Sequence, residues 1–119
     1  MTLSQGTFAR VAFDFRGTEV LVTGGTRGIG RAIASAFLAA GAGVTITGSA
    51  AEPSAYDDLP GGARYRRLRL TERDDIARLA RDCVRLDVLV NNAGGTGGAS
   101  TPYDFDTALG VNLGAVYHL

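Results

Sequence analysis

The feature that most constrains this chain is a glycine-rich turn between an apolar run and a helical pattern. Residues 21–30 read LVTGGTRGIG, with Gly24, Gly28 and Gly30 directly after the apolar run. Glycine has no Cβ, so its backbone accepts φ > 0 and its N–H group can approach a ligand closely. A helix that begins near Gly28 offers unpaired N–H groups and a positive dipole end, which suit a pyrophosphate. The turn therefore predicts dinucleotide binding; a tight strand–helix turn without a ligand is the alternative.

The rest of the chain alternates apolar runs with helical patterns. Four strands are predicted, at 19–23, 43–48, 63–70 and 86–90. Helices are predicted from near Gly28 to Gly41, after Thr71, and from Thr101 to the end, while 49–62 is predicted as a loop. This order indicates an α/β fold, a Rossmann-like doubly wound parallel sheet with strand order 3-2-1-4. Residues 1–18 are predicted to be a lead-in and 19–119 an incomplete dinucleotide-binding domain.

Each predicted helix has an apolar stripe that is expected to face the sheet. The stripes are Ile29, Ile33 and Phe37 in the first helix, Ile76, Leu79, Ala80 and Cys83 in the second, and Phe105, Leu109, Leu113 and Val116 in the last. Thr71 is the predicted cap of the second helix. Thr101-Pro102-Tyr103-Asp104 is similar to a capping box with proline at the first helical position.

Composition excludes several classes of function. Twelve basic and twelve acidic residues cancel, which argues against nucleic-acid and anionic-membrane partners. The single cysteine, Cys83, fits a reducing compartment and excludes a cysteine zinc site, and we expect no other metal site. No apolar run is long enough to span a membrane and the first residues lack the pattern of a signal peptide, so we expect a cytoplasmic protein. All twelve basic residues are arginines, and the lack of lysine excludes a P-loop.

Three motifs occur together in one order: T-G-x-x-x-G-I-G in the glycine turn, NNAG at 91–94, and VNLGAVYHL with Asn112 near the end. Together they resemble the short-chain dehydrogenase/reductase family. The resemblance implies a nicotinamide cofactor bound by Gly24, Thr26, Arg27, Gly28, Ile29, Gly30, Ser49, Leu70, Asn91, Asn92, Ala93 and Gly94. It implies for Asn112 a catalytic role, holding a water that links a catalytic lysine to solvent; a buried amide that bonds its own helix is the alternative. Asn91 and Asn92 can instead satisfy backbone groups at adjacent strand ends.

The end of the second predicted strand favours NADP over NAD. It reads TITGSAA, without the acidic residue that would bind the ribose hydroxyls of NAD, and Glu52 lies further into the loop. Arg27 can donate charge-assisted hydrogen bonds to a 2′-phosphate, and Ser49 can add a hydroxyl. The alternative is that both are solvated turn residues. Arg69 stands where the family usually has an aspartate near the adenine; it either stacks on the adenine or faces water.

The catalytic pair of the resembled family is absent from these residues. That pair is a tyrosine followed four positions later by a lysine, and the sequence contains no lysine. We therefore expect the Tyr-x-x-x-Lys segment to lie beyond residue 119, and residues 1–119 alone to be inactive. The resemblance implies hydride transfer between NADP(H) and a small-molecule carbonyl or alcohol, by a homo-oligomer, a dimer or tetramer with the last helix in an interface. The alternatives are a noncatalytic dinucleotide-binding module and an inactive truncated fragment.

Overall fold

A four-stranded parallel sheet forms the centre of the computed structural model, which describes residues 11–95 and 102–119. The strands are β1 (Glu19–Val22), β2 (Gly43–Gly48), β3 (Arg64–Arg67) and β4 (Val88–Val90), in the order β3-β2-β1-β4. The predicted order 3-2-1-4 is confirmed. Three strands are shorter than predicted: β1 ends at Val22, β3 runs only from Arg64 to Arg67, and β4 begins at Val88. Leu86, which was predicted to lie in the last strand, is 41% exposed.

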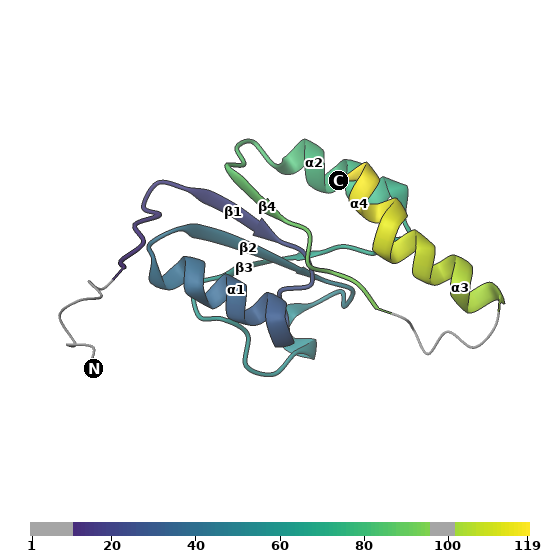
Figure 1. The fold of residues 1–119 in the computed structure, drawn as a ribbon, viewed down its shortest axis with the longest axis horizontal. Coiled ribbons are helices and arrows are strands. Elements are labelled where there is room, and N and C mark those ends of the chain that lie inside the picture. Colours follow the sequence, from purple (N-terminus) through teal and green to yellow (C-terminus); the bar gives the residue numbers. More distant parts are fainter. Residues whose placement is uncertain (1–10, 96–101) are drawn as a thin grey trace, which may run out of the picture.

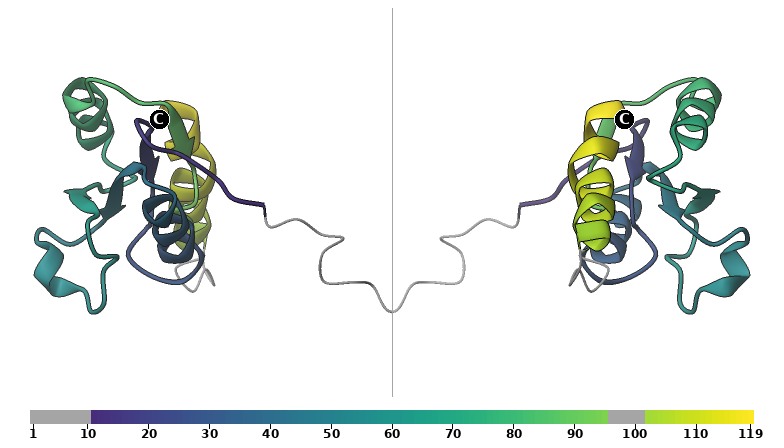
Figure 2. Two further views of the ribbon diagram at one scale, coloured as in Figure 1. Left: turned by 90° about the vertical axis from the view of Figure 1, so that its left-hand side faces the viewer. Right: turned by 90° about the vertical axis from the view of Figure 1, so that its right-hand side faces the viewer.

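Helices cover both faces of this sheet, as a doubly wound fold requires. They are α1 (Gly28–Ala39), α2 (Arg73–Asp82), α3 (Pro102–Leu109), the π-helical turn η2 (Gly110–Gly114) and α4 (Ala115–His118). The predicted loop after β2 contains one short 3₁₀ turn, η1 (Pro53–Ala55). In Figure 1, α1 lies on one side of the strands, and α2 and α4 lie on the other. The views in Figure 2 show α3, η2 and α4 following one another as one rod.

The period-2 pattern of the strands divides the apolar residues between two cores. In β1, Val20 and Val22 join the core beneath α1, while Leu21 joins the core beneath α2 and α4. The lead-in before β1 also contributes to the first core, because the ring of Phe15 packs edge-on against Phe37 of α1 at a centroid distance of 5.0 Å. The sequence pattern assigned no core residue to this segment.

Helix α1 begins at Gly28, as predicted, but its buried stripe is shorter than predicted. Ile33 and Phe37 pack against the first core, whereas Ile29 is 76% exposed. Ile29 lies in the first turn of the helix and borders a groove at the carboxyl ends of the strands, so it has no sheet surface beneath it.

Helix α2 corrects two predictions. It begins at Arg73 after Glu72, not after Thr71, and no side chain caps its N-terminus. Ile76 and Leu79 are buried as expected and Cys83 is half-buried, but Ala80 is exposed. The other buried side chain is that of Asp75, which is 6% exposed. A carboxylate tolerates this position because an arginine compensates its charge, as described below.

The stripe predicted for the last helix is wrong. Leu109, Leu113 and Val116 are 44%, 65% and 40% exposed, while Ala115 is buried against the α2 core. The π-helical turn η2 inserts an extra residue into the helical repeat, which rotates the following side chains relative to a regular α-helix. Helix α3 does begin at Pro102, as predicted. Thr101 and the side chain of Phe105 lie outside the described residues.

Candidate cofactor site

A groove of about 880 Å³ opens at the carboxyl ends of the strands. It lies where β1 and β4 are neighbours in the sheet although they are far apart in sequence, which is the position where open α/β sheets bind ligands. Of the predicted site residues, those that line this groove are Gly24, Thr26, Arg27, Gly28, Ile29, Gly30, Ser49, Leu70, Asn92, Ala93 and Gly94. Asn91 and Asn112 do not line it, although Val111, next to Asn112, does.

Two glycines of the turn are required for different reasons. Gly28 has φ +57°, and a Cβ placed on it would meet nothing within 4 Å, so it opens to the groove. Gly30 is closed in: a Cβ there would lie 2.3 Å from the carbonyl oxygen of Gly24 and 2.4 Å from Nδ2 of Asn92. Gly28 therefore leaves room for a ligand, whereas Gly30 leaves room for the protein's own backbone and the asparagine loop.

Thr23, the first residue of the T-G-x-x-x-G-I-G motif, joins the glycine turn to the asparagine loop, although it was not among the predicted site residues. Its side chain is buried, and its Oγ1 accepts hydrogen bonds from the N–H groups of Asn92 and Ala93, both at 3.1 Å. The same hydroxyl donates to the carbonyl of Val90 at 3.3 Å. The sequence did contain a sign of this role: a threonine ends an otherwise apolar strand, and a buried hydroxyl needs hydrogen-bond partners.

Asn92 completes this junction from the other side. Its Nδ2 donates to the carbonyl oxygens of Thr23 at 3.1 Å and of Gly24 at 3.2 Å. The predicted alternative, that this asparagine satisfies backbone groups of adjacent strand ends, is therefore confirmed for Asn92. Asn91 is exposed, and no hydrogen bond of its side chain occurs within the described part of the chain.

Thr47 at the end of β2 is a second hydroxyl that was not among the predicted site residues. It is 2% exposed, and its Oγ1 accepts the N–H of Gly24 at 3.2 Å. Thr26 packs against the same strand end, since a Cβ on Gly48 would lie 2.9 Å from Cγ2 of Thr26. Two strand ends thus hold the glycine turn rigidly, which fixes the direction of its backbone groups.

Asn112 holds the asparagine loop against the last helix. Its Oδ1 accepts the N–H of Gly95 at 3.0 Å, and its Nδ2 donates to the carbonyls of Gly95 at 2.7 Å and of Ala108 at 2.9 Å. The residue is exposed, so the expected burial is wrong, while the expected bond to its own helix is present. Its position in η2 explains the exposure, because the altered helical phase turns this side chain toward the loop.

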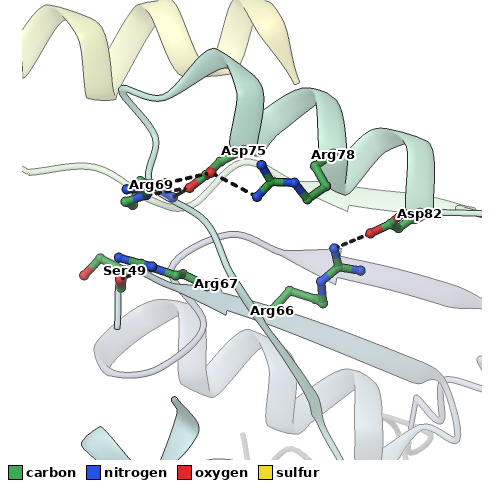
Figure 3. A network of polar contacts seen from close by, with 7 residues as sticks. All are labelled: Ser49, Arg66, Arg67, Arg69, Asp75, Arg78 and Asp82. Carbon is green, nitrogen blue, oxygen red and sulfur yellow. Dashed lines mark hydrogen bonds and ion pairs between the residues drawn. The ribbon is translucent and has the colours of Figure 1, made fainter. Parts of the chain in front are cut away.

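The charge around the groove is positive near β2. Arg27 and Ser49 are exposed, and among the described residues no carboxylate forms an ion pair with Arg27. Arg69 is exposed, and it is also ion-paired. Its Nε and Nη2 donate hydrogen bonds to the two carboxylate oxygens of Asp75 at 2.8 and 3.0 Å (Figure 3). These hydrogen bonds from Arg69 lower the pKa of Asp75 to about 2.

The N-terminus of α1 fits an anionic group. No side chain caps it, and no acidic residue lies in its first turn. The first intrahelical bond runs from Arg31 N–H to the carbonyl of Arg27, so the N–H groups before Arg31 point out of the helix. Open space over Gly28 and a helix N-terminus directed at the groove suit a pyrophosphate.

Two other classes of site find no support in the described ranges. Over 11–95 and 102–119 there is no group of three or more His, Cys, Asp or Glu side chains placed to hold a metal ion. Within the same ranges, no helix combines the length and the apolar character needed to cross a bilayer.

The chain is similar to known proteins over nearly all of its length. The family model described as short chain dehydrogenase matches residues 18–119. Nodulation protein G of Rhizobium sp. (strain N33) is 36% identical over 117 residues, covering 90% of this chain and 48% of that protein. The rhamnolipids biosynthesis 3-oxoacyl-(acyl-carrier-protein) reductase of Pseudomonas aeruginosa is 41% identical over 103 residues, covering 74% of this chain and 38% of that protein.

A solved structure agrees with these sequence matches. The Pseudomonas aeruginosa RhlG/NADP active-site complex superposes with a TM-score of 0.76 at 33% identity, covering 92% of this chain and 48% of that chain. This chain thus spans at most 48% of the length of the proteins named here. With a matching family model over 18–119, the three motifs in order and the sheet order β3-β2-β1-β4, the chain belongs to the short-chain dehydrogenase family.

Proposed function

We propose that this chain binds NADP(H) and forms the cofactor-binding part of an oxidoreductase that acts on a carbonyl or alcohol group of a small molecule. The observation that carries the proposal is the groove itself. Its floor is the uncapped N-terminus of α1 with open space over Gly28, and its lining includes Arg27 of the glycine turn and Ser49 after β2, while the acid in its lining, Glu72, comes from the segment before α2. Family membership and the similarity to an NADP complex support the same conclusion.

The residues of the turn would bind the pyrophosphate through their backbone. The N–H groups of Gly28, Ile29 and Gly30 are free of helical partners and lie at the groove. Thr23 and Asn92 hold the two loops together, so these N–H groups are oriented before a ligand arrives. Such preorganisation strengthens binding because no loop has to be ordered in the complex.

The adenosine end would be bound by residues that favour a 2′-phosphate. Arg27 can donate charge-assisted hydrogen bonds there, and Ser49 can add its hydroxyl. No carboxylate at the end of β2 would repel the phosphate, since the chain reads Ser49-Ala50-Ala51 before Glu52. Leu70 would pack against the adenine from the other side of the groove.

At the nicotinamide end, Ala93 and Gly94 would line the ribose, and Asn112 would act as a positioning residue. The bound nicotinamide supplies or accepts the hydride. Through its bonds to Gly95, Asn112 sets the path of the loop that borders this end of the groove. Proton transfer needs the tyrosine–lysine pair of the family, which the 119 residues do not contain; we propose that it lies beyond residue 119.

The lack of lysine also favours a second candidate, a dinucleotide-binding module without catalysis. One assay separates the two. A 3-oxoacyl thioester is a suitable substrate probe, because one relative is named as a 3-oxoacyl reductase. We expect residues 1–119 to bind NADPH without oxidising it, and a chain extended to family length to oxidise it in the presence of the thioester. Failure of the extended chain with this and other carbonyl probes would favour the module.

Gly28→Val tests the placement of the pyrophosphate. We expect it to abolish NADPH binding, measured by fluorescence titration, because a branched side chain would fill the space over the helix N-terminus. Gly17→Val is a matched control: Gly17 also has positive φ, +79°, and a Cβ placed on it would also meet nothing within 4 Å, but it does not line the groove. Both variants should lose about 1–2 kcal/mol of stability through backbone strain. Unchanged NADPH affinity in Gly28→Val would refute the placement.

Arg27→Ala tests the preference for NADP. We expect NADPH affinity to fall about tenfold while NADH affinity changes much less, since only NADPH carries the 2′-phosphate. Equal losses for both nucleotides would remove this basis for the preference.

The exposed apolar row Leu109, Leu113 and Val116 supports a further proposal, self-association of the protein through its last helix. A row of this kind on a helix surface is a typical contact between protein chains. Light scattering with size-exclusion chromatography would show a dimer or larger species; a monomer at all concentrations would contradict the proposal.

A further inference from the structure

Four arginines lie on β3 and the two residues after it, and three of them are neutralised. Arg64 pairs with Glu19. Figure 3 shows the other two pairs, Arg66 with Asp82 at 2.8 Å and Arg69 with Asp75. Arg67 is different: across the described residues, no carboxylate forms an ion pair with it. Arg67 thus carries a positive charge that no carboxylate of the described residues compensates.

Arg67 lies directly beside the end of β2. In the parallel register it is opposite Gly48, the last residue of that strand. Its Nε donates to the carbonyl of Ser49 at 3.2 Å, and Figure 3 shows its guanidinium next to Ser49. This bond uses one donor of the side chain. The Nη1 and Nη2 groups form no hydrogen bond within the part of the chain that the structure describes.

The turn after β2 is fixed in place, so the position of this guanidinium is fixed as well. The N–H of Ala50 donates to the hydroxyl of Tyr56 at 3.0 Å, and the hydroxyl of Tyr65 donates to the carbonyl of Ala50 at 2.5 Å. Tyr65 and Arg67 are two apart on β3 and therefore on the same face, and they bond successive carbonyls of the turn. Tyr56 also closes the space over Gly48, where a Cβ would lie 2.4 Å from its hydroxyl oxygen.

The charges around this turn leave Arg67 available to an anion. Glu52 is the acid nearest to the Ser49 turn along the chain. It is exposed and forms no ion pair with Arg67 in the described structure. Ser49 borders the groove together with Arg27. A phosphate held at the Ser49 hydroxyl would thus lie beside a turn to which a second guanidinium is bonded.

We infer that Arg67 is a second cation for the 2′-phosphate of the cofactor, acting from β3 across the Ser49 turn, in addition to Arg27 from the glycine turn. The inference rests on the proposed NADP(H) binding and extends it to a residue that the sequence motifs do not mark. Arg67 sets cofactor specificity by contact with the phosphate, and its bond to Ser49 orients both groups for that contact. A guanidinium suits this role because its donors form a planar fork that matches a phosphate.

The experiment compares Arg67→Met with Arg81→Met in the 119-residue protein. Methionine keeps most of the apolar stem and removes the charge. Arg81 is an exposed arginine of α2 without an ion pair in the described residues, so its variant controls for the loss of one positive charge. Binding is measured by calorimetry for NADPH and NADH. Adenosine 2′,5′-bisphosphate and adenosine 5′-monophosphate repeat the comparison without the nicotinamide.

We expect Arg67→Met to weaken NADPH and the bisphosphate about tenfold, and to leave NADH and the monophosphate within about twofold. Arg81→Met should leave all four within about twofold. Arg67→Lys, which keeps the charge but cannot reproduce the Nε bond with the same geometry, should give an intermediate loss. Circular dichroism and the denaturation midpoint show whether each variant is folded.

Three outcomes are decisive. If the unmodified protein prefers NADPH and Arg67→Met keeps that preference in full, the assignment of Arg67 is wrong while the proposed function stands. If Arg67→Met lowers the affinities for NADPH and NADH equally, Arg67 supports the turn and does not contact the 2′-phosphate, which also overturns the inference. If the unmodified protein binds none of the four nucleotides, the proposed function fails and the inference fails with it.

Discussion

On the α1 face of the sheet the core is apolar and tightly closed, whereas on the α2 face it is smaller and bordered by charges. Val20, Val22, Val44 and Ile46 are at most 1% exposed beneath α1. On the other face, an open pocket of about 450 Å³ lies among Leu21, Leu79 and the ion-paired Arg66 and Asp82. The comparison shows that the two faces of one sheet can be covered in different ways: by apolar packing alone on one face, and by apolar packing together with ion pairs on the other. The two faces should respond differently to substitution and to pH.

The largest effect is expected from Ile46→Ala on the α1 face. Ile46 is fully buried, and its Cγ2 would lie 2.5 Å from a Cβ on Gly25, so it also supports the glycine turn. Removing it should cost about 4 kcal/mol of unfolding free energy, measured by urea denaturation. Thr45→Ala, the neighbouring residue on the opposite face of β2, is the control and should cost about 1 kcal/mol or less. Similar losses of unfolding free energy in Ile46→Ala and Thr45→Ala would contradict the distinction between the two faces.

Ile76→Ala should have a smaller effect on the α2 face. Ile76 is 4% exposed and packs with Leu79 and Ala115. We expect a loss of about 2–3 kcal/mol, at the lower end for such a truncation, because this core borders an open pocket at Leu21 and Leu79 and can relax around the removed atoms. Hydrogen exchange would locate the change, with faster exchange in α2 and little change in α1. Uniform acceleration over both helices would show that the two faces unfold together.

Part of the pH dependence of stability should come from the α2 face. The pKa of Asp75 is lowered to about 2 from its ordinary value of 3.8, mainly by its side-chain bonds with Arg69. Since the folded pKa is the lower one, this contribution is present above pH 4 and is lost as the pH falls toward 2. Asp75→Asn should therefore lower the urea midpoint at pH 7 and flatten its fall between pH 4 and 2.

A control for this measurement is Asp74→Asn, the neighbouring residue of α2, which is exposed and has no ion pair among the described residues. Its variant should keep the acid-dependent fall of the normal protein. An unchanged pH profile in Asp75→Asn would show that the Arg69–Asp75 pair does not distinguish the two faces.

The smallest effect on stability is expected from Leu113→Gln on the outer side of the last helix. Leu113 is 65% exposed, so its replacement should change the unfolding free energy by less than about 0.5 kcal/mol. Self-association, measured by light scattering, should weaken in the same variant. A large loss of monomer stability would mean that this outer row is part of the α2-face core after all.

Local pattern was sufficient where neighbouring residues decide the structure. The start of α1 at Gly28 and the start of α3 at Pro102 follow from glycine and proline chemistry, and the succession of strands and helices along the chain follows from the alternation of apolar patterns. Local pattern failed where contacts between different elements decide the structure. Asp75 is buried because Arg69 reaches it, and Ala80 is exposed although it continues an apolar stripe. The bonds of Thr23 to Asn92 and Ala93 join residues about seventy apart, which no local pattern encodes.

By itself, the sequence determined the parallel α/β fold, the family and the position of the glycine turn, because each depends on the order of short segments and on residues that lack or restrict a side chain. Tertiary structure alone decided that Gly28 is open while Gly30 is closed, that Leu109 and Leu113 are exposed, and that Arg67 stands beside Ser49 without an ion pair in the described residues. These features depend on contacts between segments far apart in the chain, and such contacts exist only once the sheet has brought its strand ends together.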